Sequence, residues 1–531
     1  MKVMVKIICT FMSAAIILSA CSLPFALPSR TANRWLRYDI PSKVANLDPQ
    51  FTTDPTGRMV LANTGEGLVR RSPDGTLSPG AAEQYTISPD GTVYTFHLRS
   101  NGGWAGKEFR PVTAHDFVFA FQRMFMAESP FSRDYMLIKN AGDILEGKAS
   151  PTELGVKAID DHTLTITLEH RSPLFLELLS STAAIPCNRE AFQDAKGRYG
   201  LEKRFAMANG PYYLDGWTDR QLTLRPNPNY WGEVPSPGVY IYIDREDPFG
   251  RFLSGSTDVI PLISSAEVTR AGGADASVGV FQTATWCIVF NQNDPVWGNP
   301  FMRQGLAHGV DRRVFEGRLP ENLTPGDHLI PPSTLLTDKP FRLLVPQESP
   351  LGYDGIRARR LFTMGMEALG MNEFPITDMY VPDGGGHAAN MGLIQGSWQR
   401  NLSAYVNIVT VPPEEIAERF SRGDYQILLM PITPENDGIE AVLGLFETSS
   451  RQNPFGYYNP RIDELIMLGL TAADLDTAAF RFSQAERTLL ADAVVIPVYH
   501  GDSYYALGKD VHGVEVFPYG GRIYFGSGYR S

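Results

Sequence analysis

Residues 376–430 carry the pattern that most constrains the fold, because three short apolar strands alternate there with two amphipathic helices. The strands are predicted at 376–381, 405–411 and 425–430. A β-α-β-α-β order favours a parallel sheet, since each helix carries the chain back before the next strand starts. Such sheets bind ligands beyond the carboxyl ends of their strands. We therefore expect a binding site in the loop 431–438, which follows the third strand.

The glycine triplet in PDGGGHAAN follows the first of these strands and precedes a helix. Free backbone N–H groups at such a place can bind phosphate. The G-x-G-x-x-G spacing and the lysine of a P-loop are both missing from the segment. A simple turn through Gly384, Gly385 and Gly386 is therefore the favoured interpretation.

Familiar catalytic and metal-binding motifs are missing from the sequence. It contains no H-E-x-x-H, C-x-x-C or G-x-S-x-G, and the pair Asp160-Asp161 is expected in a turn. We predict neither an enzyme nor a cofactor. A binding protein fits better a chain that is 11% aromatic and has no motif for chemistry.

The first 21 residues have the pattern of a secretory signal peptide. Lys2 and Lys6 precede an apolar run that ends in small residues, and this run is too short to span a membrane comfortably. Its end, Leu18-Ser19-Ala20-Cys21, is similar to a bacterial lipobox, which predicts that Cys21 carries lipid after cleavage. An ordinary signal peptide with a chance cysteine is the alternative.

Length, charge and cysteine content narrow the possibilities further. A chain of 531 residues predicts two or three domains. The 47 basic and 59 acidic residues give a net charge of −12, which argues against nucleic acid as a partner. Cys187 and Cys287 are either a disulfide or two buried thiols, and the thiols are favoured.

Local patterns predict further elements outside residues 376–430. Strands are expected at 94–98 and 164–168, and around Leu222 and Leu224 in the aromatic-rich segment 209–232. Thr113 and Asp116 have capping-box spacing at the start of a helix. Further helices are expected around 302–310 and at 356–369, 460–468 and 477–491.

A set of motifs in a fixed order resembles the bacterial family 5 extracellular solute-binding proteins, and within them the oligopeptide-binding proteins of ABC importers. The motifs are LDPQ, EGLVRRSPDGTLSPGAAEQY, DGTVYTFHLRSNGGW, PVTAHDFVFAFQRM, LGVKAIDDHTLTITL, NGPYYLDGW, LRPNPNYWG, FNQNDPVWGNPFMRQGLAHGVDRR, YYNPRIDELI and VVIPVYHG. They cover nearly all of the chain after Cys21. In this family the segment 209–232 is framework, and its aromatics mostly pack.

The resemblance implies an α/β, periplasmic-binding-protein-like fold with two lobes and an extra inserted α+β domain. The implied division is a signal peptide at 1–21, domain I at 22–57, 185–277 and 499–531, inserted domain II at 58–184, and domain III at 278–498. It also implies a monomer that holds an oligopeptide in a cleft and delivers it to a membrane permease and its ATPase. A receptor for another solute, such as a nickel chelate or an oligosaccharide, is the alternative, and an enzyme or a sensing or adhesion lipoprotein is less favoured.

The same resemblance assigns ligand-binding roles by position. Glu435 falls where an acidic residue pairs with the peptide's α-ammonium, within a loop that also contains Ile432, Thr433 and Pro434. His387 falls near the peptide's far end. Further cleft positions of the family fall at Thr53, Pro55, Phe131 and Asn293.

Several family positions are occupied by other residues in this chain. Cleft tryptophans fall at Pro413 and Ile432, a cleft arginine at Leu429 and a cleft tyrosine at Gly501. The cysteines of a family disulfide would fall at about Thr283 and Thr433. The pocket of this chain is therefore expected to differ from those of its relatives, and so is its choice of ligand.

Overall fold

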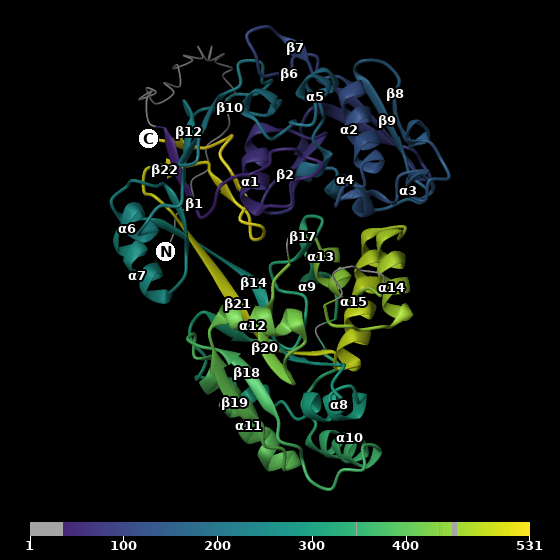
Figure 1. Cartoon of the computed structure of the whole chain (residues 1–531), viewed down its shortest axis with the longest axis vertical. Helices are drawn as coiled ribbons and strands as arrows, with labels where there is room; N and C mark the ends of the chain where they lie inside the picture. Colours follow the sequence, from purple (N-terminus) through teal and green to yellow (C-terminus); the bar gives the residue numbers. More distant parts are fainter. Residues whose placement is uncertain (1–34, 347, 435, 437, 449–453) are drawn as a thin grey trace, which may run out of the picture.

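A mixed sheet of eleven strands runs through the molecule (Figure 1). The structure, a computed structural model, describes residues 35–531 apart from 347, 435, 437 and 449–453. The strand order is β10-β11-β12-β1-β13-β21-β14-β20-β18-β19, and β15 adds to β21. The strands are β1 (Leu36–Ile40), β10 (Tyr212–Trp217), β11 (Gln221–Pro226), β12 (Val239–Ile243), β13 (Val259–Leu262), β14 (Ser277–Phe290), β15 (Leu323–Pro325), β18 (Asp378–Pro382), β19 (Asn407–Val411), β20 (Ile427–Ile432) and β21 (Val495–Leu507).

Two long antiparallel strands, β14 and β21, connect the upper and lower lobes of the molecule (Figure 1). The carboxyl-terminal part of β21 pairs with β13 in the upper lobe. The carboxyl-terminal half of β14, from Thr285 to Phe290, pairs with β20 in the lower lobe. The register of the ribbon shifts between Gln282 and Ala284 and again at Trp286 and Cys287. Such bulges bend and twist a strand pair, here where it passes between the lobes.

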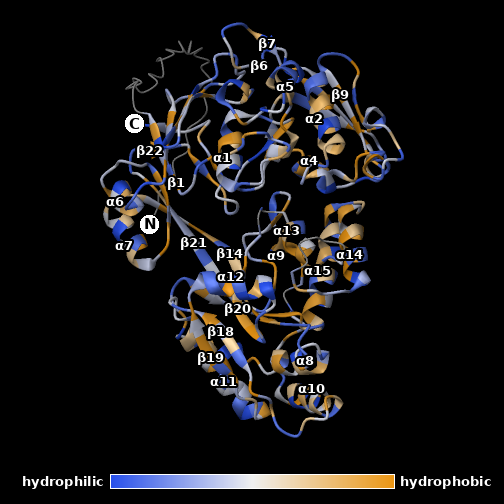
Figure 2. Cartoon of the chain, in the orientation of Figure 1, coloured by the Kyte–Doolittle hydropathy of each residue, from blue (hydrophilic) through white to orange (hydrophobic). Residues whose placement is uncertain are grey.

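The lower lobe contains the parallel strands that the sequence predicted. β18 pairs in parallel with both β19 and β20, and the observed strands begin and end within two residues of the predicted bounds. Helix α11 (His387–Leu402) connects β18 to β19, and α12 (Pro413–Arg422) connects β19 to β20. The four strand residues 427–430 are apolar, and β20 is orange in Figure 2.

The other helices of the lower lobe also follow the predicted pattern. They are α8 (Pro300–His308), α10 (Gly355–Ala368), α14 (Pro460–Leu470) and α15 (Leu475–Ala491). Asn459 caps α14 and accepts a hydrogen bond from the N–H of Arg461 at 3.1 Å. Asp474 caps α15, which starts two residues before the predicted position. The helix is about half a turn longer than predicted because its start is set by the polar cap Asp474, which the spacing of apolar residues does not reveal.

The upper lobe has two parts, and one of them is built around α1 (Pro55–Thr64) and the strands β10–β12, β1 and β13. Leu222 and Leu224 are fully buried on β11, as predicted from their alternation. The amide of Asn63 donates to the carbonyl of Ile523 at 2.7 Å and accepts from the N–H of Phe525 at 2.7 Å. Residues close to the C-terminus thus complete the part of the fold that begins at β1.

The other part of the upper lobe is a four-stranded sheet, β4-β5-β9-β8, covered by a helix. The strands are β4 (Ala82–Ile87), β5 (Val93–Leu98), β8 (Val156–Ala158) and β9 (Thr163–Thr167), and the helix is α2 (Ala114–Met126). The predicted capping box of Thr113 and Asp116 is present. Phe117, Phe121 and Met124 are buried on one face of α2.

Three large clusters of buried side chains form the core. One lies in the lower lobe, one in the part with α2, and one in the part with α1. Cys187 and Cys287 are both buried, and within the described part of the chain both are free thiols. No helix among the described residues is both long and apolar enough to span a bilayer.

Candidate binding site

The carboxyl ends of β18 and β20 lie side by side and define the candidate site. β18 lies between β19 and β20 in the sheet, so the chain leaves β18 toward one side and returns on the other. An arrangement of this kind makes a switch point, where loops diverge and leave room for a ligand. The loops after Pro382 and Ile432 both open at this edge.

Three aromatic side chains from different elements meet at this edge. The rings of Trp286 on β14 and His387 at the start of α11 have centroids 3.9 Å apart. Nδ1 of His387 shares a hydrogen bond with the hydroxyl of Tyr499 on β21 at 2.7 Å. The crossing ribbon places Trp286 beside Tyr499, and β20 places Pro431 beside Trp286. His387, which the sequence singled out, thus lies at the predicted edge.

His387 and His500 are neutral at physiological pH. Burial lowers the pKa of His387 to about 4, and no charge of a described residue contributes to that shift. Burial also lowers the pKa of His500 to about 4, and Nδ1 of His500 shares a hydrogen bond with Oγ1 of Thr285 at 3.0 Å. These rings therefore offer hydrogen bonds and stacking surface but no positive charge.

Two glycines keep the outer edges of the aromatic cluster free of side chains. A Cβ atom on Gly501 would lie 3.0 Å from Nε1 of Trp286, and a Cβ on Gly385 would lie 2.7 Å from Nε2 of His387. Gly385 also has a φ of +57°, which favours glycine. The triplet Gly384-Gly385-Gly386 forms a turn, as expected, and all three residues have positive φ.

The predicted loop after β20 is partly described. Ile432 is buried as the last residue of β20, Thr433 is exposed and Pro434 is buried. Glu435 lies outside the described residues, as does Cys21. Thr283, near which the resemblance implies a family cysteine, forms a hydrogen bond with the hydroxyl of Ser503.

Three other predicted residues lie together in the upper lobe. Thr53 and Pro55 are exposed at the start of α1. One turn further along, the guanidinium of Arg58 lies 5.7 Å from the ring centroid of Phe131, and the hydroxyl of Ser129 donates to the carbonyl of Gln50. The segments around 50–58 and 129–131 are therefore neighbours. None of these contacts involves His387 or the loop after β20.

Asn293 is not brought to the aromatic cluster. It is exposed in the turn that follows β14 at Phe290. Phe290 pairs with Ile427 at the amino end of β20, whereas the site lies at the carboxyl end beside Thr285. The length of the paired strands therefore separates Asn293 from His387.

Trp286 is the site residue that the sequence reasoning missed. The 14-residue strand β14 was not predicted, although SVGVFQTATWCIVF is rich in β-branched and aromatic residues and has a single glycine. That composition could have indicated the strand. The position of Trp286 next to His387 and Tyr499 depends on pairing between distant segments, which local patterns do not reveal.

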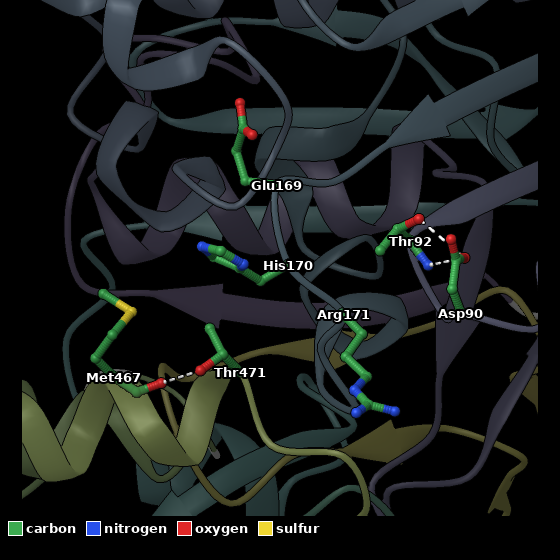
Figure 3. A pocket seen from close by; sticks show the side chains of 7 residues that line it. All are labelled: Asp90, Thr92, Glu169, His170, Arg171, Met467 and Thr471. Atoms are coloured by element: carbon green, nitrogen blue, oxygen red, sulfur yellow. Dashed lines mark hydrogen bonds between the residues drawn. The ribbon is translucent and has the colours of Figure 1, made fainter.

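A separate cavity of about 510 Å³ lies where the two lobes approach each other (Figure 3). The cavity is lined by Asp90 and Thr92 from the turn before β5, by Glu169, His170 and Arg171 from the loop after β9, and by Met467 and Thr471 from the end of α14. None of the seven residues belongs to the aromatic cluster. No group of described His, Cys, Asp and Glu side chains is arranged to hold a metal ion.

Comparison with known proteins identifies the family. The profile of the bacterial extracellular solute-binding proteins, family 5 Middle, matches residues 76–454. The dipeptide-binding protein DppE of Bacillus subtilis (strain 168) is 26% identical, over 90% of this chain and 88% of the relative. The periplasmic oligopeptide-binding protein OppA of Salmonella typhimurium is also 26% identical, over 86% of each chain.

A similar solved structure extends over most of the fold. It is the substrate-binding domain of an oligopeptide ABC transporter from Bacillus anthracis, which is 25% identical, with a TM-score of 0.71 over 94% of this chain and 99% of the other. The fold is thus that of the two-lobed periplasmic binding proteins. The chain belongs to the bacterial extracellular solute-binding proteins of family 5.

Proposed function

We propose that this protein is the exported peptide receptor of an ABC importer, and that it holds oligopeptides between its lobes. The observation that carries the proposal is the open edge at the carboxyl ends of β18 and β20, where Trp286 and His387 meet. The two relatives, a dipeptide-binding protein and an oligopeptide-binding protein, support the same ligand class. Main-chain hydrogen bonds would hold an extended peptide, as in strand addition.

The proposal includes where the protein is located and that it is a monomer. A signal peptide at 1–21 would direct export, and lipid on Cys21 would anchor a monomer to the membrane beside its permease. The protein would work without a cofactor and without catalysis. The proposed domains are 22–57, 185–277 and 499–531, then 58–184, and then 278–498. The three core clusters support three parts, but Met59, Val60 and Leu61 pack in the cluster of the part with α1 and not in that of 58–184.

Native mass spectrometry of the purified protein tests the proposal directly, because closed clefts of this kind often retain their ligand. We expect a ladder of peptide masses that disappears on denaturation. One defined non-peptide molecule would instead favour a receptor for another solute. Turnover of an added substrate would contradict the assignment as a binder.

Glu435 provides a sharper test of peptide recognition. It follows Pro434 in the loop after β20, and we propose that it pairs with the peptide's α-ammonium. Leaving one member of a buried charge pair without its partner costs about 2–5 kcal/mol. Glu435→Gln should therefore weaken a free-amine peptide by roughly 30- to 3000-fold, at 1.4 kcal/mol per decade. Glu435→Asp keeps the charge and should weaken it less.

An N-acetylated copy of the same peptide is the control for this calorimetric titration. It has no ammonium group, so it should bind the native protein weakly and lose little more in Glu435→Gln. Equal affinity of the native protein and Glu435→Gln for the free-amine peptide would show that the ammonium is bound elsewhere, or that the ligand is not a peptide.

A further inference from the structure

Trp286 presents an unused polar edge on a half-buried aromatic surface. One side of its indole faces the His387 ring at 3.9 Å. Its Nε1–H donates no hydrogen bond to a described residue. His387 uses Nδ1 for its bond to Tyr499, and its Nε2 makes no hydrogen bond with a described residue. A tryptophan N–H usually finds a partner when it is buried. Here both nitrogen edges remain for a ligand, because Gly385 and Gly501 carry no side chain to cover them.

Among the described residues, the cationic groups near this aromatic surface are already bound by other protein groups. His387 is uncharged at pH 7, because burial holds its pKa at about 4. The nearby Arg312 donates to the carbonyls of Gly326 at 2.9 Å, Leu351 at 3.2 Å and Pro497, so its guanidinium is occupied by the backbone. Arg342, which acts electrostatically on His500, is paired with Glu486. His328 is likewise paired, with Asp327 at 2.7 Å.

We infer that Trp286, supported by His387 and Tyr499, forms a subsite for an uncharged aromatic side chain of the ligand and disfavours a carboxylate there. The inference rests on the proposed peptide-binding function and specifies the ligand class. A phenyl, phenol or indole ring gains stacking and apolar burial on Trp286. A carboxylate at the same place loses water without gaining a cation. This edge of the cleft therefore selects an aromatic side chain of the ligand over a carboxylate.

The expected size of the effect follows from the area that one aromatic ring buries. Full burial of such a side chain tightens binding by about tenfold to 100-fold relative to alanine at the same peptide position. Aspartate at that position should bind at least about tenfold more weakly than alanine. The preference for Phe over Ala should appear at one position of the peptide only, because a single indole, that of Trp286, provides the stacking surface.

Calorimetric titration of matched pentapeptides tests the inference. The host is penta-alanine with free ends, and each position is replaced in turn by Phe or by Asp. Titrations use the native protein, Trp286→Ala and the control Trp35→Ala. Trp35 is also half-buried and stacks on Tyr240 with centroids 4.4 Å apart, but it lies in the upper lobe.

The inference predicts that one position favours Phe in the native protein and in Trp35→Ala. That preference should vanish in Trp286→Ala, while Trp35→Ala keeps both the preference and the affinity for the penta-alanine host. Trp286→Arg should turn the preference toward Asp at the same position, because it introduces a cation. If Trp286→Ala does not fold, Trp286→Leu replaces it and should lose most of the preference.

The outcomes separate the inference from the proposed function. If the host binds but no position favours Phe, or if the preference survives in Trp286→Ala, the aromatic subsite is wrong and peptide binding stands. If no peptide binds the native protein, the proposed function fails. The subsite is then tested with benzamide and benzoate by saturation-transfer NMR, and signals that are unchanged by Trp286→Ala would overturn it.

Discussion

Glu66 is a buried carboxylate that joins the two parts of the upper lobe. It is 6% exposed and accepts hydrogen bonds from the hydroxyl of Tyr230 at 3.0 Å and from Nε1 of Trp231 at 2.6 Å. The backbone of Glu66 is held by the side-chain amide of Asn209 through both its N–H and its carbonyl. The aromatics of the segment 209–232 therefore pack, as the family resemblance implied, and two of them also bind this carboxylate.

The ionisation of Glu66 should make stability depend on pH. Burial raises its pKa from about 4.5 to about 7, despite the hydrogen bonds from Trp231 and Tyr230 and the charges of Arg70 and Arg99. Because the folded pKa is the higher one, its favourable contribution is full below about pH 4.5 and is lost as pH rises through 7. The shift corresponds to about 3 kcal/mol.

Urea unfolding of the native protein and Glu66→Gln from pH 5 to pH 8 measures this contribution. The stability of the native protein relative to the variant should fall by up to about 3 kcal/mol across that range. Glu190→Gln makes the same chemical change on a side chain that is 71% exposed, so it serves as the control that lacks the burial of Glu66. A constant difference for Glu66→Gln would contradict the raised pKa.

At the scale of single elements, the start of α11 decides how His387 is presented. Three glycines with φ of +77°, +57° and +73° lead directly into the helix. A residue with a side chain in the left-handed region costs about 1–2 kcal/mol. The turn therefore depends on glycine for its backbone, and at Gly385 also for the space beside His387.

Substitution of two glycines by alanine in and beside α11 should have opposite effects. Gly385→Ala should lower the free energy of unfolding by about 1–2 kcal/mol and weaken ligand binding, because the new Cβ would lie 2.7 Å from Nε2 of His387. Gly392→Ala lies inside α11, and its Cβ would meet no described atom within 4 Å. It should stabilise by about 0.5–1 kcal/mol and leave binding unchanged. Thermal unfolding and calorimetry check both, and equal effects would refute this account.

The sequence predicted elements well where local patterns decide them. Helix α2 was found from its capping box and apolar spacing, and the parallel strands from their alternation with helices. The site was predicted only in part. His387 was placed from resemblance, but its contacts with Trp286 and Tyr499 come from strands more than 100 residues away on either side. The Glu66–Trp231 pair likewise joins residues 165 positions apart, and no local periodicity encodes such a contact.

At the scale of the whole molecule, the lobes touch through a hairpin as well as through the ribbon. The turn between β16 (Leu335–Leu336) and β17 (Lys339–Pro340) reaches from the lower lobe to the upper one (Figure 1). The guanidinium of Arg71 donates to the carbonyl of Thr337 at 2.7 Å. Arg71 is itself buried and paired with Glu177 at 3.0 Å. This contact favours the approach of the lobes that encloses a ligand.

A methyl group at Gly75 should hold the lobes apart. Gly75 has a φ of +86°, and a Cβ there would overlap the carbonyl oxygen of Thr337. Gly75→Ala should increase the radius of gyration in small-angle scattering with saturating ligand and weaken binding by about tenfold, equivalent to 1.4 kcal/mol. Gly147→Ala is the matched control, because Gly147 has a φ of +72° in the same lobe but its Cβ would meet no described atom within 4 Å. If both variants close and bind alike, the hairpin does not govern closure.

The hydrogen bonds between Asn63 and residues 523 and 525 have a consequence for the order of folding. The part of the upper lobe that starts at β1 lacks its last contacts until more than 450 further residues have been synthesised. Contacts of such long sequence separation form slowly, because a long loop must close before they can stabilise anything. The nascent chain therefore keeps this part of the upper lobe incomplete until residues 523 and 525 have been made, and an incomplete lobe is easier to thread through a translocation channel than a finished one.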